Sequence, residues 1–292
     1  MSPFLDLADP VVNASGTFDA IAARRAFGDA LLERFPFAAF VTKTVTIAPR
    51  QGNPAPRLFE LPSGLLNSIG LPNKGLEGFL QEDLPKLAQL PVPLIVNVMG
   101  GAHDEVAELV ERVGERPEVT ALELNVSCPN VKTGLMFGAD PHEVARLLDA
   151  VRARTGKPLI VKLTPNCASP ADVAAAAEAH GADAVSLINT LRGMAPHPHR
   201  PGEPWLGGKT GGVSGPAVRA VAICQVSEVR GRVRVPIIGM GGVQSGRHAL
   251  DLLRAGADLV AVGTESFRDP LAGERVRREL RALLPGRSFV SR

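Results

Sequence analysis

Eight apolar runs of strand length recur along the chain, and most intervals between them are long enough to hold a helix. The runs are Val11–Ala14, Ala38–Thr42, Leu94–Val98, Ala121–Asn125, Leu159–Leu163, Ala184–Ile188, Val235–Gly239 and Leu259–Gly263. Helices are expected between them over His103–Val113, Asp140–Arg154, Ala171–His180 and Gly246–Ala255. This alternation over 292 residues predicts an α/β chain whose residues 1–292 form one (β/α)8 barrel domain. A doubly wound open sheet is the alternative.

Charge and cysteine content narrow the class of protein. A net charge of +2 gives no strong field for nucleic acid or a membrane surface. The three cysteines, at positions 128, 167 and 224, cannot form a complete disulfide framework, which suits a reducing compartment. The first residues lack a signal-peptide pattern, and no apolar run approaches the ~18 residues of a membrane span. We expect a soluble cytoplasmic protein.

The predicted strands end in polar residues, which a barrel collects on one face. These residues are Asn13, Ser15, Lys43, Thr44, Asn97, Asn125, Lys162, Asn166, Asn189 and Thr190. Lys43 and Lys162 lie at or within strands, where an unpaired ammonium would be costly to bury. We therefore expect both lysines to face a ligand.

The stretch from Asn125 to Asn130 holds the candidate catalytic group. Pro129 prevents a simple continuation of the preceding strand, so Cys128 should lie on a loop just past the strand end. Two amides flank this thiol, which would let the loop present a base to a substrate while fixing polar atoms nearby. The alternative is a small buried thiol in a polar turn.

Two glycine-rich turns follow the last two strands. They are Gly239-Met-Gly-Gly242 and Gly263-Thr264, and their backbone N–H groups can cradle an anion. Each alone is common in turns, but the pair predicts a phosphorylated cofactor or substrate. The glycine spacing does not match the dinucleotide-binding fingerprint.

Two connections, Thr46–Leu80 and Leu191–Gly215, are too long and too rich in glycine and proline for ordinary loops. We expect them to be active-site loops on the carboxyl-terminal face of the barrel. His197 and His199 could suggest a metal, but no carboxylate or cysteine stands at ligand spacing, so no metal site is predicted. Cys167, on a loop of the same face, is interpreted as a packing residue.

With these features in view, the chain resembles the class 1 dihydroorotate dehydrogenases, FMN enzymes of pyrimidine biosynthesis. The likeness extends from Asn13 to Thr264. Its most specific motifs are Asn125-Val-Ser-Cys-Pro-Asn130, Asn67-Ser-Ile-Gly-Leu71, Val161-Lys-Leu-Thr-Pro165 and Lys209-Thr-Gly-Gly-Val-Ser-Gly-Pro216. The fold of this family is a (β/α)8 barrel, in agreement with the strand count.

The resemblance implies the roles of individual residues. Cys128 would take a proton from C5 of dihydroorotate while a hydride leaves C6 for FMN, with Lys43 beside both molecules. The implied FMN-binding residues are Ser15, Lys43, Thr44, Asn97, Asn125, Lys162, Ile188, Gly215, Gly241, Gly242, Gly263 and Thr264. The implied substrate-binding residues are Lys43, Asn67, Ser68, Ile69, Gly70, Leu71, Asn125, Asn189 and Thr190.

Three segments, Gly52–Arg57, Ile188–Met194 and Ile238–Gly242, resemble the NAD-linked subtype. That resemblance implies a homodimeric core in a heterotetramer with a subunit that carries FAD and a [2Fe–2S] cluster. Three scattered cysteines cannot bind a four-cysteine cluster in this chain. The fumarate-linked homodimeric subtype is the nearest alternative, whereas the membrane-associated class 2 enzymes with a serine base fit poorly.

Two further alternatives belong to other functional classes. A tRNA dihydrouridine synthase combines an FMN barrel with a similar cysteine loop, but the small net charge and the absence of an added helical domain oppose it. A non-catalytic flavin- or phosphate-binding barrel would leave Cys128, Lys43 and the strand-end asparagines unexplained.

Overall fold

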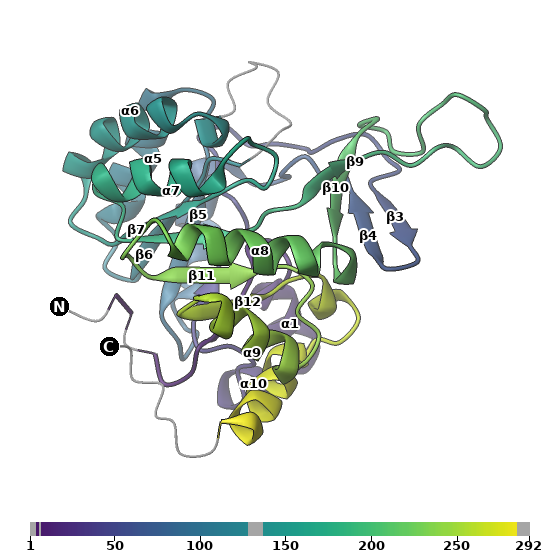
Figure 1. The fold of residues 1–292 in the computed structure, drawn as a ribbon. Coiled ribbons are helices and arrows are strands. Elements are labelled where there is room, and N and C mark those ends of the chain that lie inside the picture. Colours follow the sequence, from purple (N-terminus) through teal and green to yellow (C-terminus); the bar gives the residue numbers. More distant parts are fainter. Residues whose placement is uncertain (1–3, 6, 128–136, 285–292) are drawn as a thin grey trace.

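The computed structural model describes residues 4–5, 7–127 and 137–284, and its centre is an eight-stranded parallel sheet that curves into a barrel (Figure 1). The strands are β1 (Val11–Asn13), β2 (Phe40–Val41), β5 (Leu94–Val98), β6 (Ala121–Asn125), β7 (Leu159–Lys162), β8 (Ala184–Leu187), β11 (Ile237–Met240) and β12 (Leu259–Val262). Their order in the sheet is β1-β12-β11-β8-β7-β6-β5-β2. Each lies within one of the eight predicted runs or reaches one residue beyond it. The barrel prediction is therefore confirmed, and the open-sheet alternative is wrong.

The barrel closes through a side chain rather than a full ladder between β1 and β2. Asn13 donates from Nδ2 to the carbonyl of Val41 at 2.8 Å, and its Oδ1 accepts from the Val41 N–H at 2.8 Å. One backbone bond, from Ala38 N to Val11 O at 2.9 Å, completes the seam. Asn13 thus supplies the donor and acceptor that a paired strand residue would offer.

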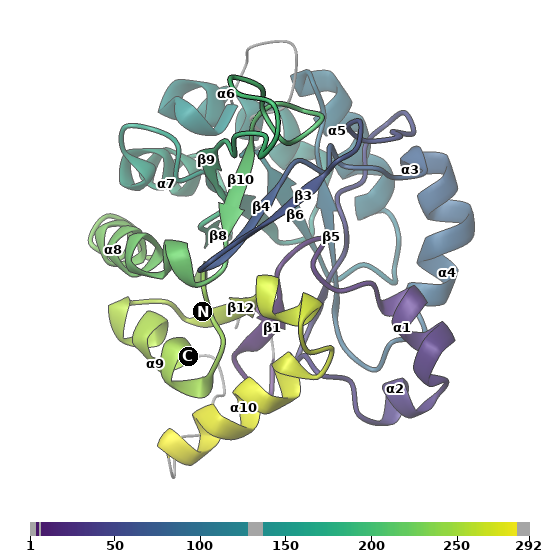
Figure 2. The same cartoon turned by 90° about the vertical axis from the view of Figure 1, so that its right-hand side faces the viewer.

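Helices surround the barrel (Figure 2). They are α1 (Ala20–Phe27), α2 (Ala30–Glu33), α3 (Gly75–Gly78), α4 (Leu84–Leu87), α5 (His103–Gly114), α6 (Pro141–Val151), α7 (Pro170–Ala179), α8 (Arg219–Arg230), α9 (Gly246–Ala255) and α10 (Ala272–Leu283). Ser169 and Ser245 cap the N-termini of α7 and α9, and Gly256 ends α9 in the left-handed conformation. The four predicted helices are confirmed within a few residues at each end.

Alternate residues of each strand point to opposite sides, so the core divides into two layers. One cluster fills the barrel and includes Val12, Ile95, Ala121, Ile160 and Ile238. The larger cluster packs the outer face of the strands against the helices. By the same alternation, Asn97, Glu123, Lys162 and Ser186 face the interior, one step closer to the carboxyl ends of their strands.

A second sheet, which the sequence analysis did not predict, stands over the carboxyl ends of the barrel strands (Figure 1). Its antiparallel order is β3-β4-β10-β9, formed by β3 (Leu58–Leu61), β4 (Gly64–Asn67), β9 (Leu191–Gly193) and β10 (Gly211–Ser214). The prediction that both long connections are loops is wrong for these segments. Half of β10 is glycine, so the strand has no alternating pattern, and it pairs with β4 far along the chain.

Candidate active site

Three of the predicted strand-end residues are connected by a chain of hydrogen bonds that runs past the carboxyl ends of β2, β6 and β8. Asn125 donates to Thr44 Oγ1 at 3.3 Å, and its Oδ1 accepts from Ser127 Oγ at 2.8 Å. Asn189 donates to Ser127 Oγ at 2.5 Å. Asn125, Asn189 and Thr44 therefore form one rigid polar wall at the barrel mouth, with Ser127 as a link that sequence reasoning missed.

Below this wall lies a buried carboxylate, Glu123. Its Oε2 accepts from Asn97 Nδ2 at 2.5 Å, and its Oε1 accepts from Ser186 Oγ at 2.7 Å. The remaining amide oxygen of Asn97 is buried and has no hydrogen-bond partner among the described residues. A buried acceptor of this kind needs a donor, which a ligand in the mouth would provide. Sequence reasoning assigned no role to Glu123. The signal that could have identified it is a single charged residue within the apolar run Ala121-Leu-Glu-Leu124.

Two lysines flank the mouth. Lys162 is 5% exposed and lies beside Asn125 and Ser186 in register, and within the described segments it forms no ion pair. Lys43 is solvent-accessible, and a Cβ on Gly16 would lie 3.8 Å from its Cγ. Partial desolvation lowers the pKa of Lys43 below its ordinary value of 10.5; Asp19 opposes the shift and Arg57 adds to it.

The turn Gly241–Val243, which follows β11, is called the anion cradle here after its predicted role. Gly241 and Gly242 have φ angles of 136° and 69°, and a Cβ on Gly242 would come within 2.9 Å of the Gly215 carbonyl. The N–H groups of Gly241, Gly242 and Val243 donate to no acceptor in the part of the chain that the structure describes. Three free N–H groups in one turn are suited to phosphate oxygens.

Three more of the predicted FMN-binding residues have defined contacts. Thr264 donates from Oγ1 to Ser214 Oγ at 2.9 Å, which ties the turn after β12 to the strand preceding Gly215. Ile188 lies beside the cradle, because a Cβ on Gly241 would meet its Cγ1 at 3.3 Å. Ser15 donates to the carbonyl of Thr42 at 2.8 Å.

The small sheet brings two predicted substrate residues together at Gly212. Asn67 donates from Nδ2 to the carbonyl of Gly212 at 3.2 Å. A Cβ on Gly212 would lie 1.9 Å from Thr190 Oγ1, so Thr190 packs directly on this glycine. The sheet thus places Asn67 and Thr190 over the carboxyl ends of the barrel strands.

The remaining predicted substrate residues contact the first long connection. Ser68 accepts from Asn53 Nδ2 at 2.9 Å, and the carbonyl of Ile69 accepts from Asn53 N at 3.0 Å. Gly70 and Leu71 have positive φ angles of 78° and 55°. This backbone conformation is strained for Leu71, and strained residues of this kind cluster at functional sites. The predicted base, Cys128, lies outside the described residues.

The remaining expectations concern metal binding, membrane spanning and Cys167. The described segments contain no group of three His, Cys, Asp or Glu side chains that could hold a metal ion. No helix among them is both long and apolar enough to cross a bilayer. Cys167 is half-buried, and desolvation raises the pKa of its thiol.

Comparison with known proteins decides the family. The family model described as dihydroorotate dehydrogenase matches residues 3–284. The chain belongs to the dihydroorotate dehydrogenase family. The predicted resemblance is thereby confirmed.

Two curated relatives carry the name dihydroorotate dehydrogenase B (NAD(+)), catalytic subunit. That of Trichlorobacter lovleyi is 47% identical over 93% of this chain and 88% of its own length. That of Bacillus pumilus is 44% identical over 99% of this chain and 92% of its own length. These names confirm the predicted likeness to the NAD-linked subtype.

A solved dihydroorotate dehydrogenase has the same fold. The crystal structure of the enzyme from Eimeria tenella, in complex with ferulenol, superposes with a TM-score of 0.75 at 26% identity. The superposition covers 97% of this chain and 83% of that one.

Proposed function

We propose that this chain is the catalytic subunit of an NAD-linked dihydroorotate dehydrogenase, which oxidises dihydroorotate to orotate in pyrimidine biosynthesis. Residues 1–292 would form one FMN-binding domain. The observation that carries the proposal is the buried Oδ1 of Asn97, in the same barrel mouth as Lys162 and the N–H groups of Gly241–Val243. Neither this oxygen nor these N–H groups have a hydrogen-bond partner among the described residues. An acceptor, a cation and an anion cradle match the ring and the phosphate of a flavin mononucleotide.

The donor set fits FMN. Gly215, Gly241, Gly242, Gly263 and Thr264 would hold its phosphate. Ser15, Thr44, Asn97, Asn125, Lys162 and Ile188 would contact the rest of the flavin. The chemistry that FMN supplies when bound is acceptance of a hydride from C6 of the substrate. The Lys162 ammonium would stabilise negative charge that develops on the ring.

The chain's own residues would bind the substrate and move its proton. Cys128 would take the C5 proton as the hydride leaves C6, so that a carbon–carbon double bond forms and two electrons leave the substrate. Lys43, Asn125 and the segment Asn67–Leu71 would hold the planar carboxylated ring, together with Asn189 and Thr190. The hydrogen-bonded wall of Thr44, Asn125, Ser127 and Asn189 would keep these groups fixed.

Electrons would then pass to NAD through a partner. We propose a cytoplasmic heterotetramer in which two copies of this chain form the core and a second type of subunit carries FAD and a [2Fe–2S] cluster. The relatives' designation as a catalytic subunit supports a partner. The fumarate-linked subtype would instead pass electrons to fumarate without one.

An anaerobic experiment tests the reaction. The purified chain, loaded with FMN, is mixed with dihydroorotate while absorbance near ~450 nm is followed. We expect bleaching, and Cys128→Ser should slow it by about 10²- to 10⁴-fold. Cys167→Ser is the control and should bleach at the wild-type rate. A flavin that stays oxidised in the wild type would reject the proposal.

The same reduced sample then distinguishes between NAD⁺ and fumarate as electron acceptors. Adding NAD⁺ alone to the reduced chain should leave the flavin bleached, because no partner is present to carry the electrons. Adding fumarate should also leave it bleached. Rapid recovery of colour with fumarate would favour the homodimeric subtype.

A further inference from the structure

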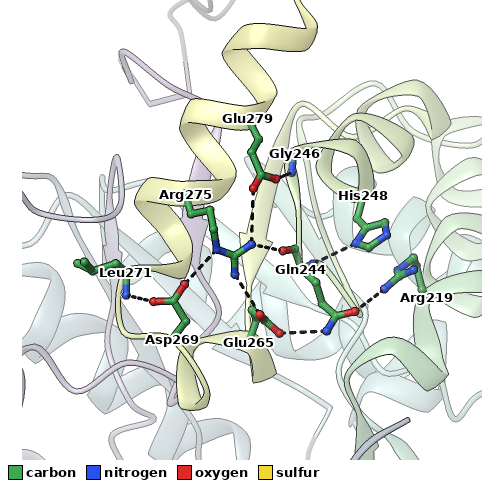
Figure 3. A network of polar contacts seen from close by, with 9 residues as sticks. All are labelled: Arg219, Gln244, Gly246, His248, Glu265, Asp269, Leu271, Arg275 and Glu279. Atoms are coloured by element: carbon green, nitrogen blue, oxygen red, sulfur yellow. Dashed lines mark hydrogen bonds and ion pairs between the residues drawn. The ribbon is translucent and has the colours of Figure 1, made fainter.

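A polar network, drawn in Figure 3, begins at Gln244, the residue that follows the anion cradle in the chain. We call it the cradle network and define it as Arg219, Gln244, His248, Glu265, Asp269, Arg275 and Glu279. Gln244 is its centre: its Nε2 donates to Glu265 Oε2 at 3.1 Å, and its Oε1 accepts from Arg219 Nη2 at 2.9 Å. It therefore connects the turn after β11 with the turn after β12.

The two arginines of the network have opposite surroundings. Arg275 on α10 contacts Glu265 at 3.0 Å, Asp269 at 3.1 Å and Glu279 at 3.7 Å, so it draws all three carboxylates to its side. Arg219, at the start of α8, has no carboxylate within ion-pair distance in the described structure. It is half-buried, and desolvation lowers the pKa of its guanidinium, although the more distant Asp251 opposes the shift. A half-buried cation that no carboxylate contacts directly is stabilised when an anion binds nearby.

Arg219 also contacts the cradle itself. Its Nε donates to the carbonyl of Gly242 at 2.9 Å. In a trans peptide the C=O and the following N–H point in opposite directions, so this bond fixes the Val243 N–H on the side away from Arg219. A Cβ on Gly242 would lie 2.9 Å from the Arg219 Cβ, so Arg219 packs directly on this turn and leaves no room for a side chain at position 242.

We propose that Arg219 is a positioning residue for the phosphate of the bound flavin: it holds the Gly242 peptide so that its neighbouring N–H groups face the phosphate, and it adds a positive charge behind them. Gln244 would keep the guanidinium in place and separate it from Glu265. This inference rests on the proposed FMN-binding function. It assigns to Arg219 the part of the affinity that depends on phosphate charge, while the ring is held elsewhere.

Comparison of FMN with riboflavin tests this assignment, because riboflavin lacks only the phosphate. The flavin-free, full-length chain is titrated with each ligand, and quenching of flavin fluorescence gives the affinity. At low salt, Arg219→Gln should weaken FMN binding by about tenfold and leave riboflavin binding unchanged. The loss for FMN should shrink as salt is raised, since ions screen the missing charge.

Two variants complete the design. Arg219→Lys keeps the charge and should retain most of the FMN affinity that Arg219→Gln loses. Arg278→Gln removes an exposed charge on α10 and should bind both flavins as the wild type does. Equal losses for FMN and riboflavin in Arg219→Gln, or no loss for either, would overturn the proposal. A wild-type chain that binds neither flavin would reject the proposed function and this inference with it.

Discussion

Asn97 donates its amide N–H to Oε2 of Glu123 over 2.5 Å, and this bond decides which end of the amide faces the barrel mouth. Because Nδ2 is taken by the carboxylate, the buried acceptor Oδ1 is the end left for a ligand. Ser186 holds the other carboxylate oxygen at 2.7 Å, so Glu123 cannot rotate freely. A buried glutamate thus orients an asparagine that we place against the flavin.

Two substitutions of Glu123 distinguish the contribution of its hydrogen bonds to stability from the contribution of its charge. Glu123→Ala leaves the Asn97 amide and the Ser186 hydroxyl without their partner, and should lower the free energy of unfolding by about 2–4 kcal/mol. Glu123→Gln keeps an acceptor for Asn97 and a group that can pair with Ser186, so it should cost less than about 1.5 kcal/mol. Urea unfolding of the three proteins measures both values. Equal losses in the two variants would show that charge, not hydrogen bonding, sets the stability.

The seam of the barrel depends on Asn13. Asn13→Ala removes the two hydrogen bonds to Val41 and leaves its N–H and C=O unpaired in the interior, so the free energy of unfolding should fall by about 2–4 kcal/mol. Thr17→Val is the matched control, because its hydroxyl bonds only to carbonyls in a part-buried turn. It should cost less than about 1.5 kcal/mol. A similar loss in both variants would contradict a special role for the seam.

The sequence predicts the barrel well because its signals are local. Each strand is a short apolar run, and Ser169 and Gly256 mark helix ends through bonds to their near neighbours. The four-stranded sheet depends instead on pairing between β4 and β10, which no local pattern reveals. Gly212 in β10 allows close packing against Thr190, a requirement that appears only in three dimensions.

The residues of the candidate site also divide into those that local sequence signals predict and those that depend on distant contacts. Residues at strand ends, such as Asn97 and Lys162, could be predicted because a parallel barrel gathers those ends at one face. Glu123 and Arg219 were missed because their roles depend on partners on other elements, Asn97 and Gly242 respectively. The family resemblance added residue roles that the patterns alone did not assign.

Gly212 should control substrate binding without affecting the flavin. Gly212→Ala would place a methyl group where Thr190 Oγ1 now lies and would disturb the contact with Asn67. We expect dihydroorotate affinity to fall about tenfold or more, since both displaced groups would donate or accept bonds to the substrate. FMN affinity should be unchanged. Gly156→Ala, where a Cβ meets nothing within 4 Å, is the control and should bind both molecules normally.

Loss of the Lys43 charge should weaken dihydroorotate binding at alkaline pH. Desolvation lowers the pKa of the Lys43 ammonium below 10.5, so the positive charge is lost, as pH rises, earlier than in a free lysine. Because dihydroorotate is an anion, its affinity should fall as pH increases through that lowered pKa. Stopped-flow reduction of the flavin at increasing dihydroorotate concentration, repeated from pH 7 to about pH 10.5, measures this.

Two substitutions at Lys43 assign this alkaline fall in affinity to that residue. Lys43→Arg keeps a charge that persists throughout the range, so the alkaline fall in affinity should disappear even if binding at neutral pH is weaker. Lys43→Gln has no charge at any pH, so its affinity should be low and independent of pH. If the alkaline fall in dihydroorotate affinity persists unchanged in Lys43→Arg, it must come from the titration of another group. The placement of the Lys43 ammonium against the substrate anion would then be wrong.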